Sequence, residues 1–146
     1  AMLIASTDQY VLGYLGRALS MELSAVQLYT TQAKLTDAWV LKEVAEKFRA
    51  EAAEELEHAE RLISRILAVG VAPNASQLRP VKLGQSLRQL LEHDYAFEME
   101  LVSLYQDAEQ HCSRIGDQDN RLLFETLLEE EKEHGRSLVK WLQQVS

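Results

Sequence analysis

Cysteine is nearly absent from this sequence, with Cys112 the single one among 146 residues. One thiol excludes an intrachain disulfide and any Cys-x-x-Cys metal or redox module, and it favours a reducing, cytoplasmic setting. Long apolar runs and a recognisable signal peptide are also lacking, so we expect no membrane partner. Ala1, which precedes Met2, is set aside as a cloning remnant.

Basic side chains are in the minority. Lysine and arginine total 15 against 23 aspartates and glutamates, and the formal net charge is -8. Nucleic acid is therefore not an expected partner, because binding phosphate requires a basic face. Hydrophobic residues make up 47% of the chain, which is a globular composition, and the length fits a single domain over residues 1–146.

Apolar residues recur with helical spacing in four segments, and no segment shows the period of a strand. We therefore expect an all-α fold. The expected helices cover about residues 7–35, 38–68, 86–115 and 118–144.

Local signals predict where these helices begin and end. Ser6 and Ser86 each open a Ser-x-x-Gln capping box, which predicts the starts of the first and third helices. Thr36 and Asp37 are expected to end the first helix and to cap the second. Gly116 predicts the end of the third helix, and Asp117, next in the sequence, predicts the cap of the fourth.

Residues 69–85 form the single long connection, and Gly70, Pro73, Pro80 and Gly84 make this stretch unsuitable for a helix. Seventeen extended residues reach about 55–60 Å, whereas a thirty-residue helix is about 45 Å long. The connection can therefore cross from one end of a helix bundle to the other. Because the other connections are short, the sequence predicts a four-helix bundle of two antiparallel hairpins joined by a long crossover.

Four glutamates interrupt the apolar stripes at mid-helix, where an unpaired carboxylate costs several kcal/mol. They are Glu22, Glu55, Glu98 and Glu131, one on each expected helix. Glu55 and Glu131 are each followed three positions later by a histidine, His58 and His134. Residues three apart lie on one helix face, so each pair can direct a carboxylate and an imidazole at the same point.

The whole pattern repeats with an offset of 76 positions. Glu22 corresponds to Glu98, Glu55 to Glu131, and His58 to His134. A single Glu-x-x-His pair is weak evidence, because surface helices often carry such pairs by chance. The joint spacing is more specific, because a protein core does not collect four carboxylates without cations. Four carboxylates and two imidazoles suit two iron or manganese ions, and we expect two iron ions per chain.

Three further residues lie on the same apolar stripes. Tyr29 follows Glu22 by two turns, and core packing explains it as well as a catalytic role, in which it hydrogen-bonds a carboxylate or donates an electron. Asp94, one turn before Glu98, is a candidate to orient a metal ligand by hydrogen bonding to it. Cys112 is interpreted as a small core residue.

The segments around the four glutamates resemble the ligand segments of the bacterioferritins, and the resemblance extends along almost the whole chain. They are Met21–Leu23 with Tyr29, Glu54–Arg61, Asp94–Glu98 and Glu130–His134. The resemblance implies that Glu22 and His58 bind one iron terminally. It implies likewise that Glu98 and His134 bind the other iron. Glu55 and Glu131 would bridge the two.

The same resemblance implies an activity and an assembly. The activity is oxidation of Fe(II) to Fe(III) by O2 or H2O2, a ferroxidase reaction, followed by storage of the mineral inside a shell of twenty-four subunits. The chain departs from the family at Leu56, which stands where the family has its haem-ligating methionine, so no haem is expected from this chain alone. A second, methionine-bearing bacterioferritin subunit in a mixed shell would supply that ligand. Ala50 also stands where the family has a histidine on its inner surface, and we expect no counterpart of the family's short fifth helix.

Three functions are compatible with these patterns. The first is iron storage by a ferroxidase that forms a homo-oligomer, from a dimer up to the closed shell. The second is a di-iron or di-manganese oxidase or peroxidase without storage. The third is a metal-free helical interaction module, which would have to keep its glutamates buried without cations.

Overall fold

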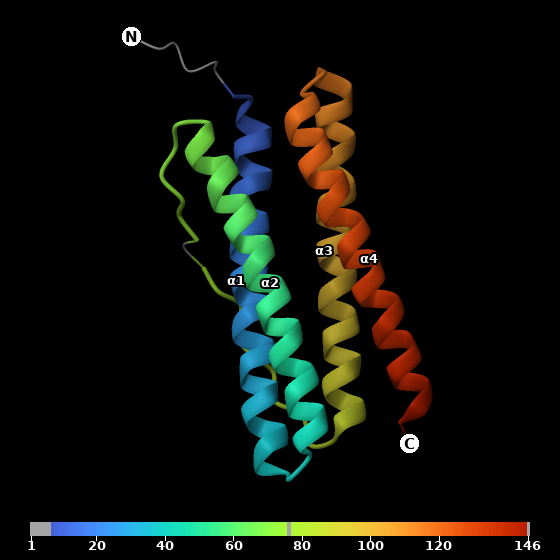
Figure 1. Cartoon of the computed structure of the whole chain (residues 1–146). Helices are drawn as coiled ribbons and strands as arrows, with labels where there is room; N and C mark the ends of the chain where they lie inside the picture. Colours follow the sequence, from blue (N-terminus) through green and yellow to red (C-terminus); the bar gives the residue numbers. More distant parts are fainter. Residues whose placement is uncertain (1–6, 76, 146) are drawn as a thin grey trace. The chain divides into compact units, whose positions relative to one another are not determined.

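The computed structural model describes residues 7–75 and 77–145, and over these residues the chain forms four α-helices and no strand. The helices are α1 (Gln9–Ala38), α2 (Lys42–Ala68), α3 (Leu87–Ile115) and α4 (Gln118–Gln144), labelled in Figure 1. The chain divides into two compact units between Val81 and Lys82. The first unit holds the antiparallel hairpin of α1 and α2, and the second holds that of α3 and α4. The all-α class and the two hairpins are confirmed, whereas their packing into one domain stays a prediction.

The start of α1 is capped by Asp8, whose carboxylate accepts hydrogen bonds from the backbone N–H groups of Tyr10 and Val11. The cap expected from the sequence, Ser6, lies outside the described residues. Asp8 satisfies two of the four backbone donors that a helix leaves unpaired at its start.

The predicted break at Thr36 and Asp37 is wrong, because both residues belong to the last turns of α1. The Thr36 hydroxyl donates to the backbone oxygen of Gln32, at 2.7 Å, and so bonds within its own helix. Asp37 accepts two hydrogen bonds from the guanidinium of Arg49 on α2, at 2.9 and 3.0 Å. The side chains that suggested a cap are therefore engaged elsewhere, and α2 begins without a side-chain cap at Leu41.

The turn between α1 and α2 closes through two backbone hydrogen bonds. Val40 N–H donates to the oxygen of Asp37 and Leu41 N–H to that of Thr36, both at 2.9 Å. This pattern requires a left-handed residue at its centre, and Val40 has a φ of 62°. The helices α2 and α3 end in the same way, but with Gly70 and Gly116 at the left-handed position.

The second hairpin follows the sequence closely. Ser86 accepts from Gln89 N–H and Asp117 from Asn120 N–H, so both expected caps are confirmed. The capping box at Ser86 is only half formed, because the Gln89 side chain accepts from Gln85 N–H instead of from Ser86. Arg88 in the first turn of α3 donates to the backbone oxygens of Leu142 and Val145, which ties the start of α3 to the end of α4.

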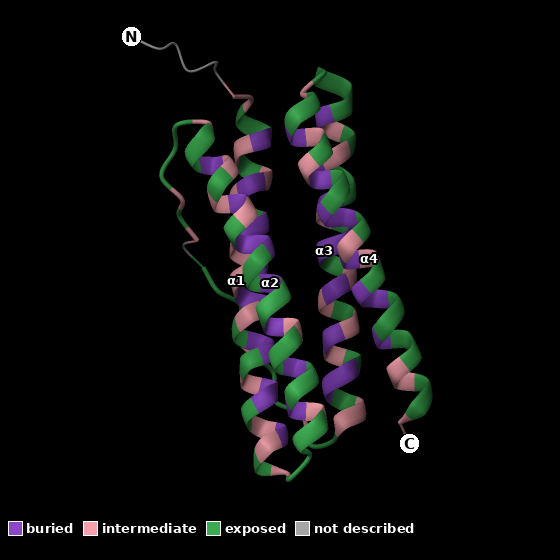
Figure 2. Cartoon of the chain, in the orientation of Figure 1, coloured by how far each residue is buried: buried purple, intermediate pink, exposed green. Residues whose placement is uncertain are grey.

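Buried residues recur along each helix, as the purple segments in Figure 2 show. In the first hairpin the largest fully buried apolar side chains are Leu15, Leu19, Tyr29, Phe48 and Leu62. In the second they are Leu90, Leu91, Leu101, Tyr105, Phe124 and Leu127. Cys112 is also fully buried, as expected of a small core residue.

The long connection reverses direction at the end of α2 and runs back along the first hairpin (Figure 1). Arg79 N–H donates to the Ser24 hydroxyl at the middle of α1, at 2.9 Å. No helix of the described residues is long and apolar enough to cross a membrane.

Candidate metal centre

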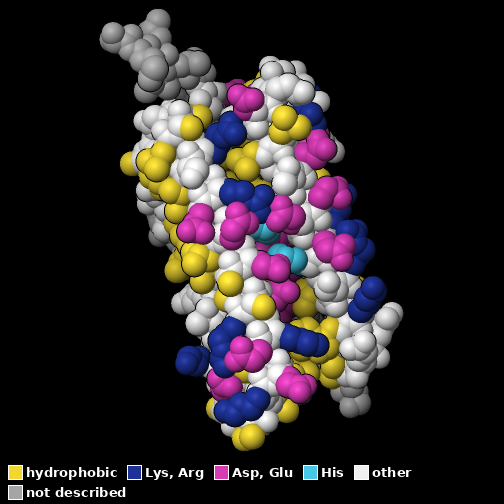
Figure 3. Space-filling view, in the orientation of Figure 1, with side chains coloured by type: hydrophobic (Ala, Val, Ile, Leu, Met, Phe, Trp, Pro, Cys, Tyr) yellow, Lys and Arg dark blue, Asp and Glu magenta, His cyan; other side chains and the backbone are white. Residues whose placement is uncertain are grey.

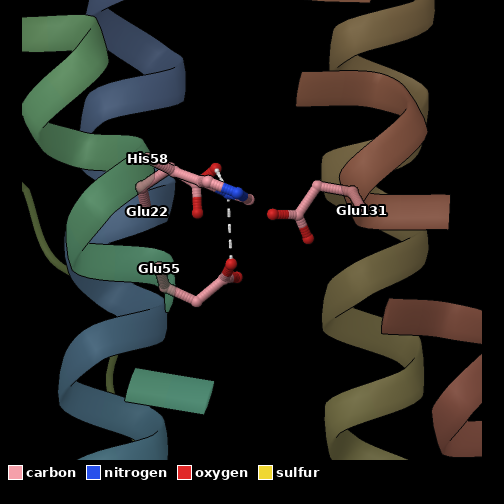
Figure 4. A group of neighbouring side chains, drawn as sticks. All are labelled: Glu22, Glu55, His58 and Glu131. Atoms are coloured by element: carbon pink, nitrogen blue, oxygen red, sulfur yellow. Dashed lines mark hydrogen bonds and ion pairs between the residues drawn. The ribbon is translucent and has the colours of Figure 1, made fainter. Parts of the chain in front are cut away.

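The first hairpin brings Glu22, Glu55 and His58 together at the middle of its two helices, and we refer to these residues as the first triad. His58 Nδ1 lies 3.1 Å from Glu22 Oε2 and 3.2 Å from Glu55 Oε1. Figure 4 shows the two carboxylates and the imidazole pointing to the same side of the hairpin, Glu22 from α1 and the other two from α2. All three are at most 1% exposed.

The spacing along the chain explains why these residues meet. Glu55 and His58 are three positions apart and therefore share a face of α2. Glu22 and His58 lie eighteen positions before and after Val40, at the centre of the turn, so an antiparallel hairpin places them at the same level. Because α1 continues to Ala38 instead of ending near residue 35, the turn falls later in the chain than the sequence predicted. With the turn centred on Val40, Glu22 and His58 lie opposite each other.

The second hairpin repeats the arrangement with Glu98 on α3 and Glu131 and His134 on α4, the second triad. Both glutamates are fully buried, and His134 is 8% exposed. His134 Nδ1 lies 3.5 Å from Glu131 Oε2 and 3.9 Å from Glu98 Oε2. The second triad is thus looser than the first, although its residues occupy corresponding positions.

Each triad has the donor set of a site for a transition-metal cation. One ligand atom from each of its three residues lies within 4.8 Å of the others, which is close enough for a shared ion. Carboxylate oxygens suit hard cations such as Fe(III), and imidazole nitrogen retains affinity for Fe(II), Mn(II) or Zn(II). A cation also offsets the desolvation that buried carboxylates undergo. The residues present therefore fit iron.

Carboxylates surround the triads at the surface as well. Acidic side chains gather at mid-length over α2 and again over α4, next to histidine edges (Figure 3). On α2 these include Glu54 and Glu57, and on α4 Glu129 and Glu133, all of them exposed. Glu57 and Glu133 pair with Arg61 and Arg136. Such paired surface acids belong to the solvated faces of their helices.

The other residues singled out from the sequence are found as follows. Tyr29 and Asp94 are fully buried, so both remain candidates for a role beside the ligands. Leu56, at the position of the family's haem ligand, is 46% exposed on α2. Ala50 is also exposed.

One buried residue was not singled out from the sequence, Tyr105 on α3. It is fully buried, and it follows Glu98 by seven positions, as Tyr29 follows Glu22. The signal was available, because Tyr29 and Tyr105 are themselves separated by the offset of 76 positions that relates the two triads.

Comparisons with known proteins agree with this geometry. Residues 12–146 match the family model described as a ferritin-like domain. A bacterioferritin of Rhodobacter capsulatus is 36% identical over 87% of this chain and 79% of its own length. A bacterioferritin of Brucella melitensis is 34% identical over 85% of this chain and 77% of its own length.

The chain belongs to the bacterioferritins, within the ferritin-like family. A solved structure of the Rhodobacter capsulatus bacterioferritin matches with a TM-score of 0.92 and 34% identity, covering 95% of this chain and 87% of that one. That structure is described as having a metal-free dinuclear site and a haem iron. The ferritin-like four-helix fold and a role in iron storage, both expected from the sequence, are confirmed by this membership.

Proposed function

We propose that the chain is a ferroxidase that oxidises Fe(II) at a di-iron centre built from the two triads, and that it stores the ferric product. Each triad would supply the terminal ligands of one iron, and its remaining glutamate would be shared between the two ions. The terminal ligands are Glu22 and His58 for one ion, and Glu98 and His134 for the other. Glu55 and Glu131 would be the carboxylates that both ions share.

The observation that carries this proposal is the burial of the first triad with its atoms 3.1 and 3.2 Å apart, together with its repetition in the second hairpin. Two triads of carboxylate and imidazole provide six ligands, of which four are anionic. Two Fe(II) ions carry the four positive charges that neutralise those carboxylates. Two adjacent ferrous ions supply two electrons to a single molecule of O2 or H2O2.

The protein's residues contribute binding and protection from water. Buried carboxylates favour the ferric state over the ferrous state, because a low dielectric strengthens the attraction of an anion for the more highly charged cation. The Nδ1 atoms of both histidines face the glutamates, so Nδ1 is the atom through which each histidine would hold an iron ion. The four ligand glutamates are fully buried, which keeps bulk water away from their carboxylates.

Storage requires an assembly, and we propose a homo-oligomer up to a closed shell, with Fe(II) and O2 or H2O2 as the small-molecule partners. The mass of the purified particle, measured by light scattering after size-exclusion chromatography, distinguishes an iron-storing shell from an oxidase without storage. A large assembly that retains iron mineral supports storage. A dimer that oxidises iron and releases it supports the alternative.

The oxidation itself is tested by titrating the protein with Fe(II) under anaerobic conditions and then admitting oxygen. We expect fast oxidation to saturate at two irons per chain and to be lost in Glu131→Ala. Glu129→Ala, an exposed neighbour on α4, serves as the matched control and should behave as the wild type. Unchanged oxidation kinetics in Glu131→Ala would count decisively against the proposed centre.

A further inference from the structure

A groove of about 460 Å³ lies between α3 and α4, and all the residues that line it belong to the second hairpin. It follows the C-terminal half of α4, where this helix moves away from α3 (Figure 1). Its floor is largely apolar and is formed by Tyr95, Met99, Val102 and Val139. A groove of this volume with such a lining is typical of sites that hold a small molecule.

Gly135 gives the groove its depth. This glycine is buried at the middle of α4, and a Cβ at its position would lie 2.7 Å from Met99 Cε. The methyl group of the methionine therefore lies against bare helix backbone. A glycine inside a helix is less favourable than an alanine, so its presence needs a reason. Any larger residue would push Met99 outward and make the floor of the groove shallower.

Three cations line the α4 side of the groove at intervals of four residues, which places them on one helix face. They are Lys132, Arg136 and Lys140. Lys132 and Arg136 also pair with Glu129 and Glu133 at the surface, where such pairs hold their partners only weakly. Lys140 forms no ion pair with any of the residues that the structure describes. None of the described residues that line the groove is acidic, although the chain as a whole has a net charge of -8.

The first hairpin carries no equivalent set of residues. The offset of 76 positions that relates the metal ligands maps the three cations onto Leu56, Glu60 and Ser64, none of which is basic. It maps Gly135 onto Ala59. The ligands occur in both hairpins, whereas these cations and this glycine occur in the second alone. Neither the helical hairpin nor the set of metal ligands therefore requires them.

We propose that this groove binds the anion of a long-chain fatty acid, with the carboxylate at Lys140 and Arg136 and the hydrocarbon chain on the apolar floor. A carboxylate fits the cations, because it forms charge-assisted hydrogen bonds with both lysine and arginine. A hydrocarbon chain fits the floor, because affinity rises with each methylene group removed from water. Residues 132–143 span about 16 Å along α4, close to the extended length of a saturated chain of about twelve carbons. This binding is independent of the proposed oxidation of iron.

The experiment is isothermal titration calorimetry of laurate, a fatty acid anion of that length, into the purified protein below the concentration at which laurate forms micelles. Butyrate tests the carboxylate without the chain, and dodecyltrimethylammonium tests the chain with the opposite charge. The variants are Lys140→Gln, Lys140→Arg and Val139→Ser, and thermal unfolding checks that each is folded. Lys34→Gln is the matched control, because Lys34 is an exposed lysine on α1 that likewise has no ion pair among the described residues.

We expect saturable binding of about one laurate per chain, and no saturation by butyrate or dodecyltrimethylammonium over the same range. Lys140→Gln should weaken laurate binding by about fivefold to tenfold, Val139→Ser by about threefold, and Lys140→Arg by less than about twofold. Lys34→Gln should bind laurate as the wild type does. In a second measurement, laurate should slow the acetylation of Lys140 by acetic anhydride, followed by mass spectrometry, and leave that of Lys34 unchanged.

The inference is overturned if laurate binding does not saturate, if Lys140→Gln binds laurate as tightly as the wild type, or if dodecyltrimethylammonium binds equally well. Equal protection of Lys34 and Lys140 would overturn it too, because it would mean that laurate coats the protein as a detergent. A changed particle mass in Lys140→Gln with unaltered laurate affinity would assign the groove to a second copy of the chain. Sedimentation with phosphatidylglycerol vesicles, without binding of free laurate, would assign it to a membrane surface. Iron oxidation should be the same in all these variants, so failure of the ferroxidase function and failure of this inference are observed separately.

Discussion

His58 Nδ1 lies 3.1 Å from Glu22 Oε2, which ties the middle of α2 to the middle of α1. Both side chains are almost completely buried, at 2% and 0% exposure. A carboxylate and an imidazole this close act as one unit toward a cation. Removing either leaves the other without the geometry that a shared ion needs.

A double-mutant cycle on this pair gives the first prediction. We expect Glu22→Gln and His58→Gln each to weaken binding of Co(II), followed by its visible absorption. Because the two ligands act together, the double variant should bind no worse than the poorer single variant. The expected coupling is about 1–3 kcal/mol. Glu60→Gln, on the exposed side of α2, is the control. Strictly additive effects would mean that the two residues do not share an ion.

The second prediction concerns the metal-free protein. Glu98 is fully buried, and His134 Nδ1 is 3.9 Å away, beyond hydrogen-bond distance. Glu98→Gln removes a carboxylate whose burial is costly when no cation is bound, so we expect the free energy of unfolding in chelator to rise by about 1–2 kcal/mol. Denaturant titrations measure it. The gain should be smaller for Glu22→Gln, which also loses the contact with His58.

The same variants should respond oppositely when metal is added. Mn(II), which does not reduce oxygen, stabilises the wild type in proportion to its occupancy of the native site. Glu98→Gln should lose most of this stabilisation, so the variant is more stable without metal and less stable with it. A variant that is destabilised even in chelator would show that Glu98 has a structural role independent of cations.

The third prediction separates a true helix cap from a false one. Asp117 caps α4 and also accepts from the Asn120 side-chain amide, at 2.8 Å. Asp117→Ala should lower the free energy of unfolding by about 1 kcal/mol. Asp37 caps nothing, and its partner Arg49 is 41% exposed, so Asp37→Ala should cost only about 0.5 kcal/mol. Equal losses, measured by thermal or urea unfolding, would contradict the assignment of the turn.

The ends of the helices show how far local signals determine this fold. Ser86 and Asp117 cap their helices and Gly116 ends α3 as the sequence predicts, through contacts with close neighbours in the sequence. Thr36 and Asp37 do not, because the Thr36 hydroxyl bonds within α1 and Asp37 pairs with Arg49, twelve positions away. A local sequence pattern carries no information about the contact between Asp37 and Arg49, and this contact explains why Asp37 does not cap α2.

The metal ligands were accessible from the sequence for a different reason. A carboxylate in an apolar stripe is energetically anomalous, so Glu22 and Glu55 stand out wherever the period of the helix is recognised. Tyr105 does not stand out, because a tyrosine in a core is ordinary.

The last prediction comes from the turn between α1 and α2. Val40 has a φ of 62°, a left-handed conformation that costs an L-residue about 1–2 kcal/mol and a β-branched one at least as much. The side chain is 75% exposed, so little packing is lost when it is removed. Glycine adopts this conformation freely but adds about 0.5–1 kcal/mol of entropy to the unfolded chain. The net effect of Val40→Gly should be a gain of about 0.5–1 kcal/mol.

Gly116 offers the reverse substitution as a control, because it has a φ of 76° in an equivalent turn. A Cβ there would meet nothing within 4 Å, so Gly116→Val tests the backbone conformation and not crowding. We expect it to lower the free energy of unfolding by about 1 kcal/mol or more, since the strain now present at Val40 would be added. Denaturant unfolding of the two variants and of the double variant measures both effects, which should be additive because the turns lie in different hairpins. Destabilisation by Val40→Gly would mean that the valine side chain has a contact that offsets its backbone strain.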